Sequence, residues 1–254
     1  MVSVSRIAPR LVSVLVRGDE LGAFADAAPT SHLKVFLPAP GQDEPLLPEF
    51  LPEGQAIPDG ARPSVRTYTP RRFDAATGTL EIQFVLHGAG PASEWAERAS
   101  TGDKVAVAGP GGRFVLDPGA ERWWIAGDES AIPAVATLLE ALPASAAAEV
   151  HLEVADADDE VEFASQAKTE ITWHHRRSPD AFGAELDEAA RGAAIADGTR
   201  VWVACEAAAM RGIRRYFLGE RRLPASSLTT RGYWRLGEAN HPDHDYGDDE
   251  LPAR

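Results

Sequence analysis

Arg66 and Tyr68 have the chemistry to hold a ligand that combines phosphate with a flat ring system. They lie in residues 65–70, Val-Arg-Thr-Tyr-Thr-Pro, whose composition predicts a short strand closed by a proline. Residues two apart on a strand share one face. Arginine offers a rigid fork of donors to phosphate, and a tyrosine ring can stack on a flat heterocycle. The alternative is an ordinary edge strand with an exposed arginine and an amphipathic tyrosine.

A second stretch, residues 80–96, has the pattern of a strand, a glycine-rich turn and a helix start. Apolar and polar side chains alternate over residues 80–87, which predicts a half-buried strand. Pro91 suits the first turn of the following helix, and Ser93 can cap it. Free backbone N–H groups at such a start bind phosphate. Taken singly, this segment is equally compatible with a plain strand-turn-helix unit.

With residues 102–110, Gly-Asp-Lys-Val-Ala-Val-Ala-Gly-Pro, these stretches resemble the siderophore-interacting protein family of FAD-binding ferric-siderophore reductases. That family carries Arg-x-Tyr-Thr/Ser, then Val-Leu-His-Gly-x-Gly-Pro-Ala-Ser-x-Trp-Ala, then Gly-Asp-Lys/Arg-Val-x-Val-Ala-Gly-Pro. Residues 229–235, Thr-Thr-Arg-Gly-Tyr-Trp-Arg, resemble the Gly-Tyr-Trp-Arg motif at the end of the family's sequence pattern. The resemblance covers nearly the whole chain, and three motifs in order are far more specific than one.

The resemblance implies that bound FAD supplies the redox chemistry and that the protein orients and tunes it. Arg66 is implied to hold the FAD phosphates and Tyr68 to stack on the isoalloxazine, while the helix start with Ala92 and Ser93 receives the pyrophosphate. Further contacts to the flavin or its ribityl chain, partly through backbone, are implied for Thr69, Val85 and His87. Gln83 stands where the family often has Asp, which removes a charge there.

The substrate that the resemblance implies is a ferric siderophore, in which hard anionic oxygens surround Fe(III). Lys34 lies at the strand position of the family's substrate-binding lysine, although a solvated surface lysine is the alternative. The family often has Arg directly after Ala-Gly-Pro, whereas this chain has Gly111 there and its basic residue is Arg113. Arg231 and Arg235 either complete a basic patch or pair with the acidic end of the chain.

The composition excludes several classes of partner. The chain has 254 residues and a formal net charge of −14, which argues against nucleic acid and anionic membranes as partners. Its single cysteine, Cys205, rules out an internal disulfide and is expected to be a small buried residue rather than a redox group. No apolar run suits a signal peptide or a bilayer span, so a cytoplasmic location is expected.

Two folding patterns follow one another along the chain. The first half predicts a small β-barrel, and the resemblance implies the six-stranded antiparallel flavin-binding barrel of the ferredoxin-reductase type. Its strands are expected at residues 11–16, 32–37, 65–70, 80–87, 104–108 and 113–116. Residues 38–63, rich in Pro, Gly and acids, are expected to form a long surface loop.

From residue 119, strand and helix patterns alternate, which is typical of a parallel sheet wrapped by helices. Strands are expected at residues 122–126, 149–155, 170–174 and 200–204, and helices at 132–142, 180–194 and 207–218. Ligands in such folds bind at the carboxyl ends of the strands, here residues 127–130 and 205–207.

The predicted organisation is an FAD-binding barrel domain (1–118), an α/β NAD(P)H-binding-like domain (119–236) and an acidic tail (237–254). The tail is expected to be solvated and partly disordered rather than a metal site.

The preferred function is FAD-dependent reduction of an Fe(III)-siderophore to release Fe(II), with NADH, NADPH or reduced ferredoxin as electron donor. A carrier that binds flavin or siderophore without turnover is one alternative. A general flavin-dependent electron-transfer reductase is another. No motif that would read the ribose of a nicotinamide dinucleotide can be placed, so the sequence leaves the donor open.

Overall fold

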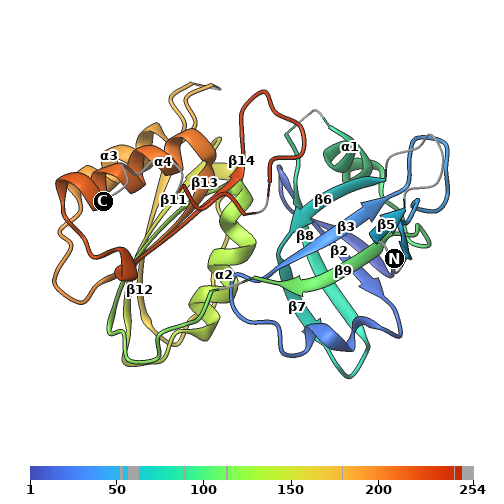
Figure 1. Ribbon diagram of the computed structural model, residues 1–254, viewed down its shortest axis with the longest axis horizontal. Coiled ribbons are helices and arrows are strands. Elements are labelled where there is room, and N and C mark those ends of the chain that lie inside the picture. Colours follow the sequence, from blue (N-terminus) through green and yellow to red (C-terminus); the bar gives the residue numbers. More distant parts are fainter. Residues whose placement is uncertain are drawn as a thin grey trace. The chain divides into compact units, whose positions relative to one another are not determined.

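The chain forms two compact units, Met1–Arg113 and Phe114–Arg254, in the computed structural model (Figure 1). The structure describes residues 1–51, 54–56, 63–87, 90–112, 114–178, 180–242 and 244–247. Among those residues, no helix is both long enough and apolar enough to cross a lipid bilayer.

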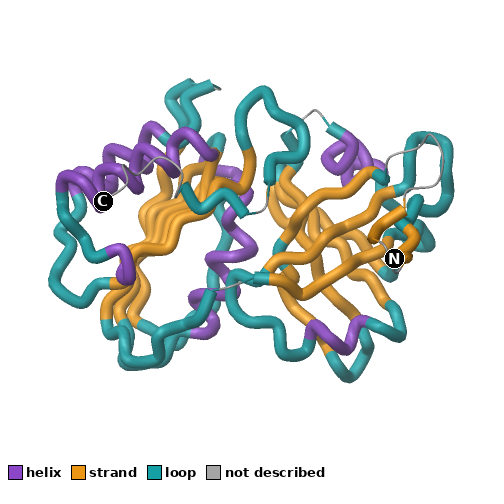
Figure 2. The backbone as a smooth tube through the Cα atoms, in the orientation of Figure 1, coloured by secondary structure: helices purple, strands orange, loops and turns teal. Residues whose placement is uncertain are grey.

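Two antiparallel sheets form the main body of the first unit (Figure 2). One has the order β1 (Ser3–Ala8), β2 (Leu11–Arg17), β8 (Thr79–Val85), β7 (Pro70–Asp74), and the other the order β6 (Ser64–Tyr68), β3 (His32–Leu37), β9 (Ala106–Gly111). Only Thr69 separates β6 from β7, so one bent strand passes from the second sheet to the first. Counted once, that strand gives these two sheets six strands, which confirms the predicted antiparallel barrel.

Apolar residues that alternate along the strands fill the barrel. Val12, Val14 and Val16 on β2 face the same core as Leu80, Ile82 and Phe84 on β8 and Leu33, Val35 and Leu37 on β3. Helix α1 (Pro91–Arg98) begins directly after Gly90 and adds Ala92 and Ala96 to this core. The core therefore holds the helix start in place against β8.

The barrel differs from the prediction in several places. Residues 114–117 have no regular structure, and Arg113 lies outside the described residues. The strand expected at 104–108 is β9, which begins two residues later, and β1 and the β7 half of the bent strand were missed. The stretch 38–63 is not all loop, because β4 (Glu49–Leu51) pairs with β5 (Gly54–Ala56).

The second unit is a five-stranded parallel sheet, as the alternating pattern predicted. Its order is β12 (Lys168–His175), β11 (Ala147–Val154), β10 (Arg122–Asp128), β13 (Arg200–Glu206), β14 (Leu228–Trp234). The strand β14 was not predicted. Helix α2 (Ile132–Ala141) packs on one face, and α3 (Ala184–Gly192) and α4 (Ala207–Arg215) pack on the other (Figure 1).

The observed bounds of α3 and α4 differ from the predicted ones for local reasons. Gly183 has a φ of 75°, a conformation that favours glycine, and α3 begins only after it instead of at residue 180. Helix α4 passes into a π-helical turn at Tyr216–Glu220. The short 3-10 helices are η1 (Leu21–Phe24), η2 (Glu129–Ala131), η3 (Ala157–Asp159) and η5 (Ala225–Ser227).

Candidate functional site

A row of aromatic rings joins β6, β8 and α1 in the barrel unit. The ring of Tyr68 lies 4.3 Å from that of Phe84, and Phe84 lies 5.4 Å from Trp95, centroid to centroid. Tyr68 pairs with the buried Leu33 across the β3–β6 ladder, so its ring points to the core-facing side. Burial raises the pKa of Tyr68, so its half-buried ring stays neutral.

Arg66 shares that side of the ladder because it pairs with the buried Val35. Its Nη1 donates to the carbonyl oxygen of Val65 at 2.8 Å, which fixes one edge of the half-buried guanidinium. The expectation that Arg66 and Tyr68 share a face is confirmed. A cationic fork and an aromatic plate thus lie two residues apart on one side of one strand.

The start of α1 is tied to the end of β8. The backbone N–H of His87 donates to Oγ of Ser93 at 3.2 Å. Ser93 and Ala92 are buried, so what they can offer an anion is their backbone N–H groups. Those groups precede the first helical hydrogen bond, from Glu94 N to Gly90 O at 3.0 Å. The helix start has the donors that a phosphate requires.

The other predicted flavin contacts lie along the same strands. Thr69 is buried at the bend between β6 and β7. Val85 is the half-buried last residue of β8, and His87 is exposed just after it. The structure therefore gathers the predicted residues on β6, the end of β8 and the start of α1.

The predicted substrate residues belong to different units of the chain. Lys34 on β3 donates from Nζ to Oγ1 of Thr67 at 2.8 Å. Arg113 lies outside the described residues. Arg231 is buried in the second unit with its guanidinium 4.6 Å from the centroid of the Tyr246 ring, so it offers little to a ligand in solution.

Sequence reasoning missed a set of acidic side chains at the carboxyl edge of the parallel sheet. The predicted segments 127–130 and 205–207 do lie side by side, because β10 pairs with β13. Oδ2 of Asp128 accepts hydrogen bonds from Glu206 N at 2.9 Å and from Nε1 of Trp234 at 2.7 Å. One buried carboxylate thereby links the ends of three strands.

Glu206 caps helix α4 with its own side chain. Its Oε2 accepts from Ala208 N at 2.6 Å and Ala209 N at 3.0 Å, and its Oε1 accepts from Leu236 N at 3.2 Å. A dinucleotide phosphate commonly uses N–H groups at such a helix start. In this chain a carboxylate already occupies them.

Glu153 and Glu129 surround a single guanidinium at the same edge. Arg176 pairs with both oxygens of Glu129 and lies 3.8 Å from Oε1 of Glu153. Glu153 is fully buried and accepts from Gly183 N at 2.8 Å. Burial raises its pKa to about 7, and burial together with the charge of Glu129 raises that of Asp128 to about 6. These carboxyls can hold a proton near neutral pH.

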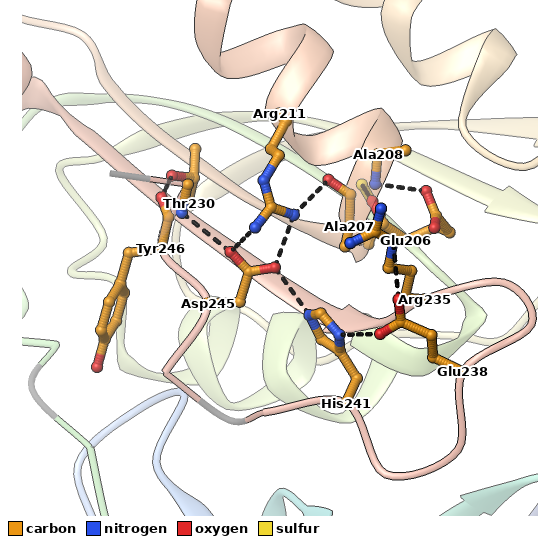
Figure 3. Close-up of polar contacts among 12 residues, drawn as sticks. Glu206, Ala207, Ala208, Arg211, Thr230, Arg235, Glu238, His241, Asp245 and Tyr246 are labelled. Carbon is orange, nitrogen blue, oxygen red and sulfur yellow. Dashed lines mark hydrogen bonds and ion pairs between the residues drawn. The ribbon is translucent and has the colours of Figure 1, made fainter. Parts of the chain in front are cut away.

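The chain after Trp234 packs back on the second unit (Figure 3). Asp245 accepts from Arg211 through both oxygens at 2.8 Å and from His241 at 2.8 Å. Its backbone oxygen accepts from Gly232 N at 2.9 Å, which attaches the segment to β14. The expected solvated tail is therefore wrong for this part, since Asp245 is only 7% exposed.

Comparison with known proteins identifies the family. Residues 1–114 match the siderophore-interacting FAD-binding domain, and residues 120–237 match the siderophore-interacting protein domain. This chain belongs to the siderophore-interacting protein family. The resemblance drawn from the three sequence motifs is thereby confirmed.

Members of the family align with nearly the whole chain. The ferric vibriobactin reductase ViuB of Vibrio cholerae is 31% identical, over 94% of this chain and 89% of its own length. The NADPH-dependent ferric-chelate reductase of Escherichia coli is 30% identical, over 91% and 89%. The crystal structure of a siderophore utilization protein from T. fusca superposes with a TM-score of 0.86 at 36% identity, covering 96% of this chain and 94% of that one.

The fold extends beyond the family. The ferredoxin reductase of carbazole 1,9a-dioxygenase has a TM-score of 0.64 at 17% identity, over 89% of this chain and 64% of that one. At this identity the likeness concerns the fold alone. It agrees with the barrel and parallel-sheet units described above.

Proposed function

We propose that this protein is an FAD-dependent reductase that converts an Fe(III)-siderophore into Fe(II) and free chelator. The observation that carries the proposal is the juxtaposition of Arg66, Tyr68 and the start of α1 in a chain of this family. The names of the Vibrio and Escherichia relatives support the choice of ferric chelates as substrate.

The side chains present fit FAD. Arg66 supplies a cation for its phosphates, the N–H groups of Ala92 and Ser93 supply neutral donors, and Tyr68 supplies a ring face. The chemistry that FAD would supply when bound is the passage of electrons to Fe(III). The protein's part is to hold the phosphates, orient the ring and keep its surroundings neutral, which the partly buried row of aromatic rings supports.

The substrate is an anionic chelate whose hard oxygens bind Fe(II) less strongly than Fe(III). Reduction therefore loosens the metal without breaking any bond within the chelator. In a protein of net charge −14, the chelate needs a local cation to approach. We assign that contact to Lys34, with Arg113 as the second candidate.

The electron donor is either a nicotinamide dinucleotide or a reduced ferredoxin. The Escherichia relative is named NADPH-dependent, which favours the first. Against it, a phosphate at α4 would have to displace the carboxylate of Glu206. We place the reaction in the cytoplasm, where such donors occur and a lone thiol such as Cys205 stays reduced.

An FAD titration of the apoprotein tests the cofactor assignment. Arg66→Ala should weaken FAD binding by roughly one to two decades, because a charge-assisted contact contributes about 1.5–3 kcal/mol. Arg72→Ala, on the exposed side of β7, is the matched control and should bind FAD like the wild type. Equal affinities for the wild type and Arg66→Ala would remove Arg66 from the site.

A further inference from the structure

A groove of about 400 Å³ runs along the second unit between the β11–β12 edge of the sheet and helix α3. It contains two histidines from neighbouring strands, His151 on β11 and His174 on β12. Its charged lining comes from Glu149, Arg177, Glu185 and Glu188. None of these side chains has a part in the proposed flavin chemistry.

The two imidazoles face one another through ring nitrogens. Nδ1 of His151 lies 3.0 Å from Nε2 of His174, and the rings are stacked with centroids 5.2 Å apart. Two nitrogens at that separation share one proton. A metal ion that replaces the proton would be bound by both nitrogens after a small widening, since metal–imidazole bonds are about 2.0–2.1 Å long.

Glu149 sets the tautomer of His151. Its Oε1 lies 2.8 Å from Nε2 of His151, and a carboxylate can only accept there. His151 therefore carries its proton on Nε2 and presents the lone pair of Nδ1 to His174. A carboxylate that orients a histidine through its far nitrogen is the usual second partner at metal sites in proteins.

His174 is poised to be a neutral ligand. Burial lowers its pKa, and the neighbouring His151 lowers it further, while Glu185 and Glu188 on α3 oppose the shift. A neutral imidazole is the form that binds metal. The hydrogen bond between His151 and His174 also requires that at least one of the two facing nitrogens carries no proton.

We propose that His151 and His174 bind a divalent first-row transition metal ion, with Glu188 as a third ligand. Among the described residues no three such side chains already surround a common point, so the glutamate must turn toward the pair. Reorienting the Glu188 side chain should cost little free energy. Glu188 now pairs with Arg177 at 3.1 Å, and both side chains are more than two-thirds exposed, a setting in which ion pairs contribute little.

Imidazole nitrogens with one carboxylate suit Zn²⁺, Ni²⁺, Cu²⁺ and Fe²⁺ rather than Mg²⁺ or Ca²⁺. Binding displaces the shared proton from Nε2 of His174, and the same ring takes up a proton at Nδ1, so two neutral imidazoles bind the ion without net proton release. Fe²⁺ is the product of the reaction proposed above, and a role as its acceptor rests on that proposal. The site itself does not depend on it.

The test is calorimetric titration of the full chain, stripped with a chelator, with ZnCl₂ at pH 7.5. We expect one site of micromolar affinity and little net proton release per zinc, measured in two buffers of different ionisation enthalpy. His174→Gln should weaken binding tenfold or more. His175→Gln is the matched control, because His175 lies next in the same strand but contacts Glu160 at 2.8 Å, and it should bind like the wild type.

Equal zinc affinity in the wild type and His174→Gln, or an equal loss in His175→Gln, would overturn the site. Wild-type affinity in Glu188→Gln would overturn the third ligand. If His174→Gln has a lowered melting temperature, carbethoxylation of the histidines in the wild-type chain provides a second test of the site. Zinc should protect His151 and His174 from the reagent and leave His175 reactive. No siderophore or electron donor is present, so the result is independent of the reductase proposal.

Discussion

The ammonium group of Lys34 and the hydroxyl of Thr67 lie 2.8 Å apart on one face of the β3–β6 ladder, and Arg66 and Tyr68 lie on the other. Paired residues of antiparallel strands point to the same side, which fixes both assignments. A chelate held by Lys34 and a flavin held by Arg66 would therefore contact opposite faces of the same two strands. Electrons that travel from the flavin to the chelate would therefore have to cross the end of the β3–β6 ladder or go around it.

Lys34→Ala should raise the KM for an anionic ferric siderophore roughly threefold to tenfold at low salt, the equivalent of about 1 kcal/mol. The effect should shrink as ionic strength rises, because salt screens exposed charges. Lys104→Ala is the control, since it removes the same charge from an exposed ion pair with Glu44. If both variants raise KM equally, net charge rather than a contact at Lys34 is responsible.

Tyr68 contributes to both the fold and the flavin site, because its ring packs on Phe84. Tyr68→Leu should keep most of that packing but lose a stacking partner, weakening FAD binding by up to roughly tenfold and shifting the flavin spectrum. Tyr68→Phe should leave both unchanged. Absorbance titration measures the two variants. A spectrum for Tyr68→Leu that matches wild type would show that another residue stacks on the flavin.

Glu153 should make the second unit less stable as pH rises. Its folded pKa of about 7 lies above the value near 4.5 of an unfolded glutamate, so the folded state holds more protons between those values. Stability should therefore fall as pH rises from about 4.5 to about 7 and level off above.

Glu153→Gln removes this dependence. The Tm difference between Glu153→Gln and the wild type should grow by roughly 4–8 °C from pH 5 to pH 8. This corresponds to a change in the unfolding free energy on the order of 2 kcal/mol. Thermal melts at the two pH values measure the difference, and Glu121→Gln, at an exposed position, is the control. A pH-independent Tm difference would show that Glu153 is ionised throughout this range.

Asp245→Asn should destabilise the second unit by about 3 kcal/mol, because it leaves the largely buried Arg211 without its carboxylate. Asp187→Asn breaks an exposed pair with Arg191 and should cost less than about 1 kcal/mol. Denaturant unfolding compares the two. Similar losses in both variants would mean that the segment around Asp245 contributes little to folding.

The sequence predicts the elements whose pattern is local. Alternating residues in β2, β3 and β8 and the strand–helix alternation of the second unit were read correctly, because each pattern follows from one buried face. The β1–β2 hairpin was missed because β1 is partly exposed and has weak alternation. The bend at Thr69 was missed because Pro70 was read as the end of a strand rather than as the change of sheet.

Long-range contacts determine most of the features that could not be predicted from the sequence. The ion pair between Arg211 and Asp245 joins residues 34 apart, and nothing near either residue signals it. The role of Glu206 had a local signal, since an acidic side chain directly before a helix can act as its cap. Gln83, singled out as a missing charge, instead donates to Glu81 at 2.8 Å.

The most direct test of the central claim is rapid mixing of the FAD-loaded, pre-reduced protein with a ferric siderophore under anaerobic conditions, in the presence of an Fe²⁺ trap. The account predicts reoxidation of the flavin at a rate that rises with siderophore concentration, with formation of the trapped Fe²⁺ complex in the stoichiometry that the electrons require. Tight binding of the ferric siderophore with the flavin still reduced and no Fe²⁺ formed would contradict it and identify a carrier.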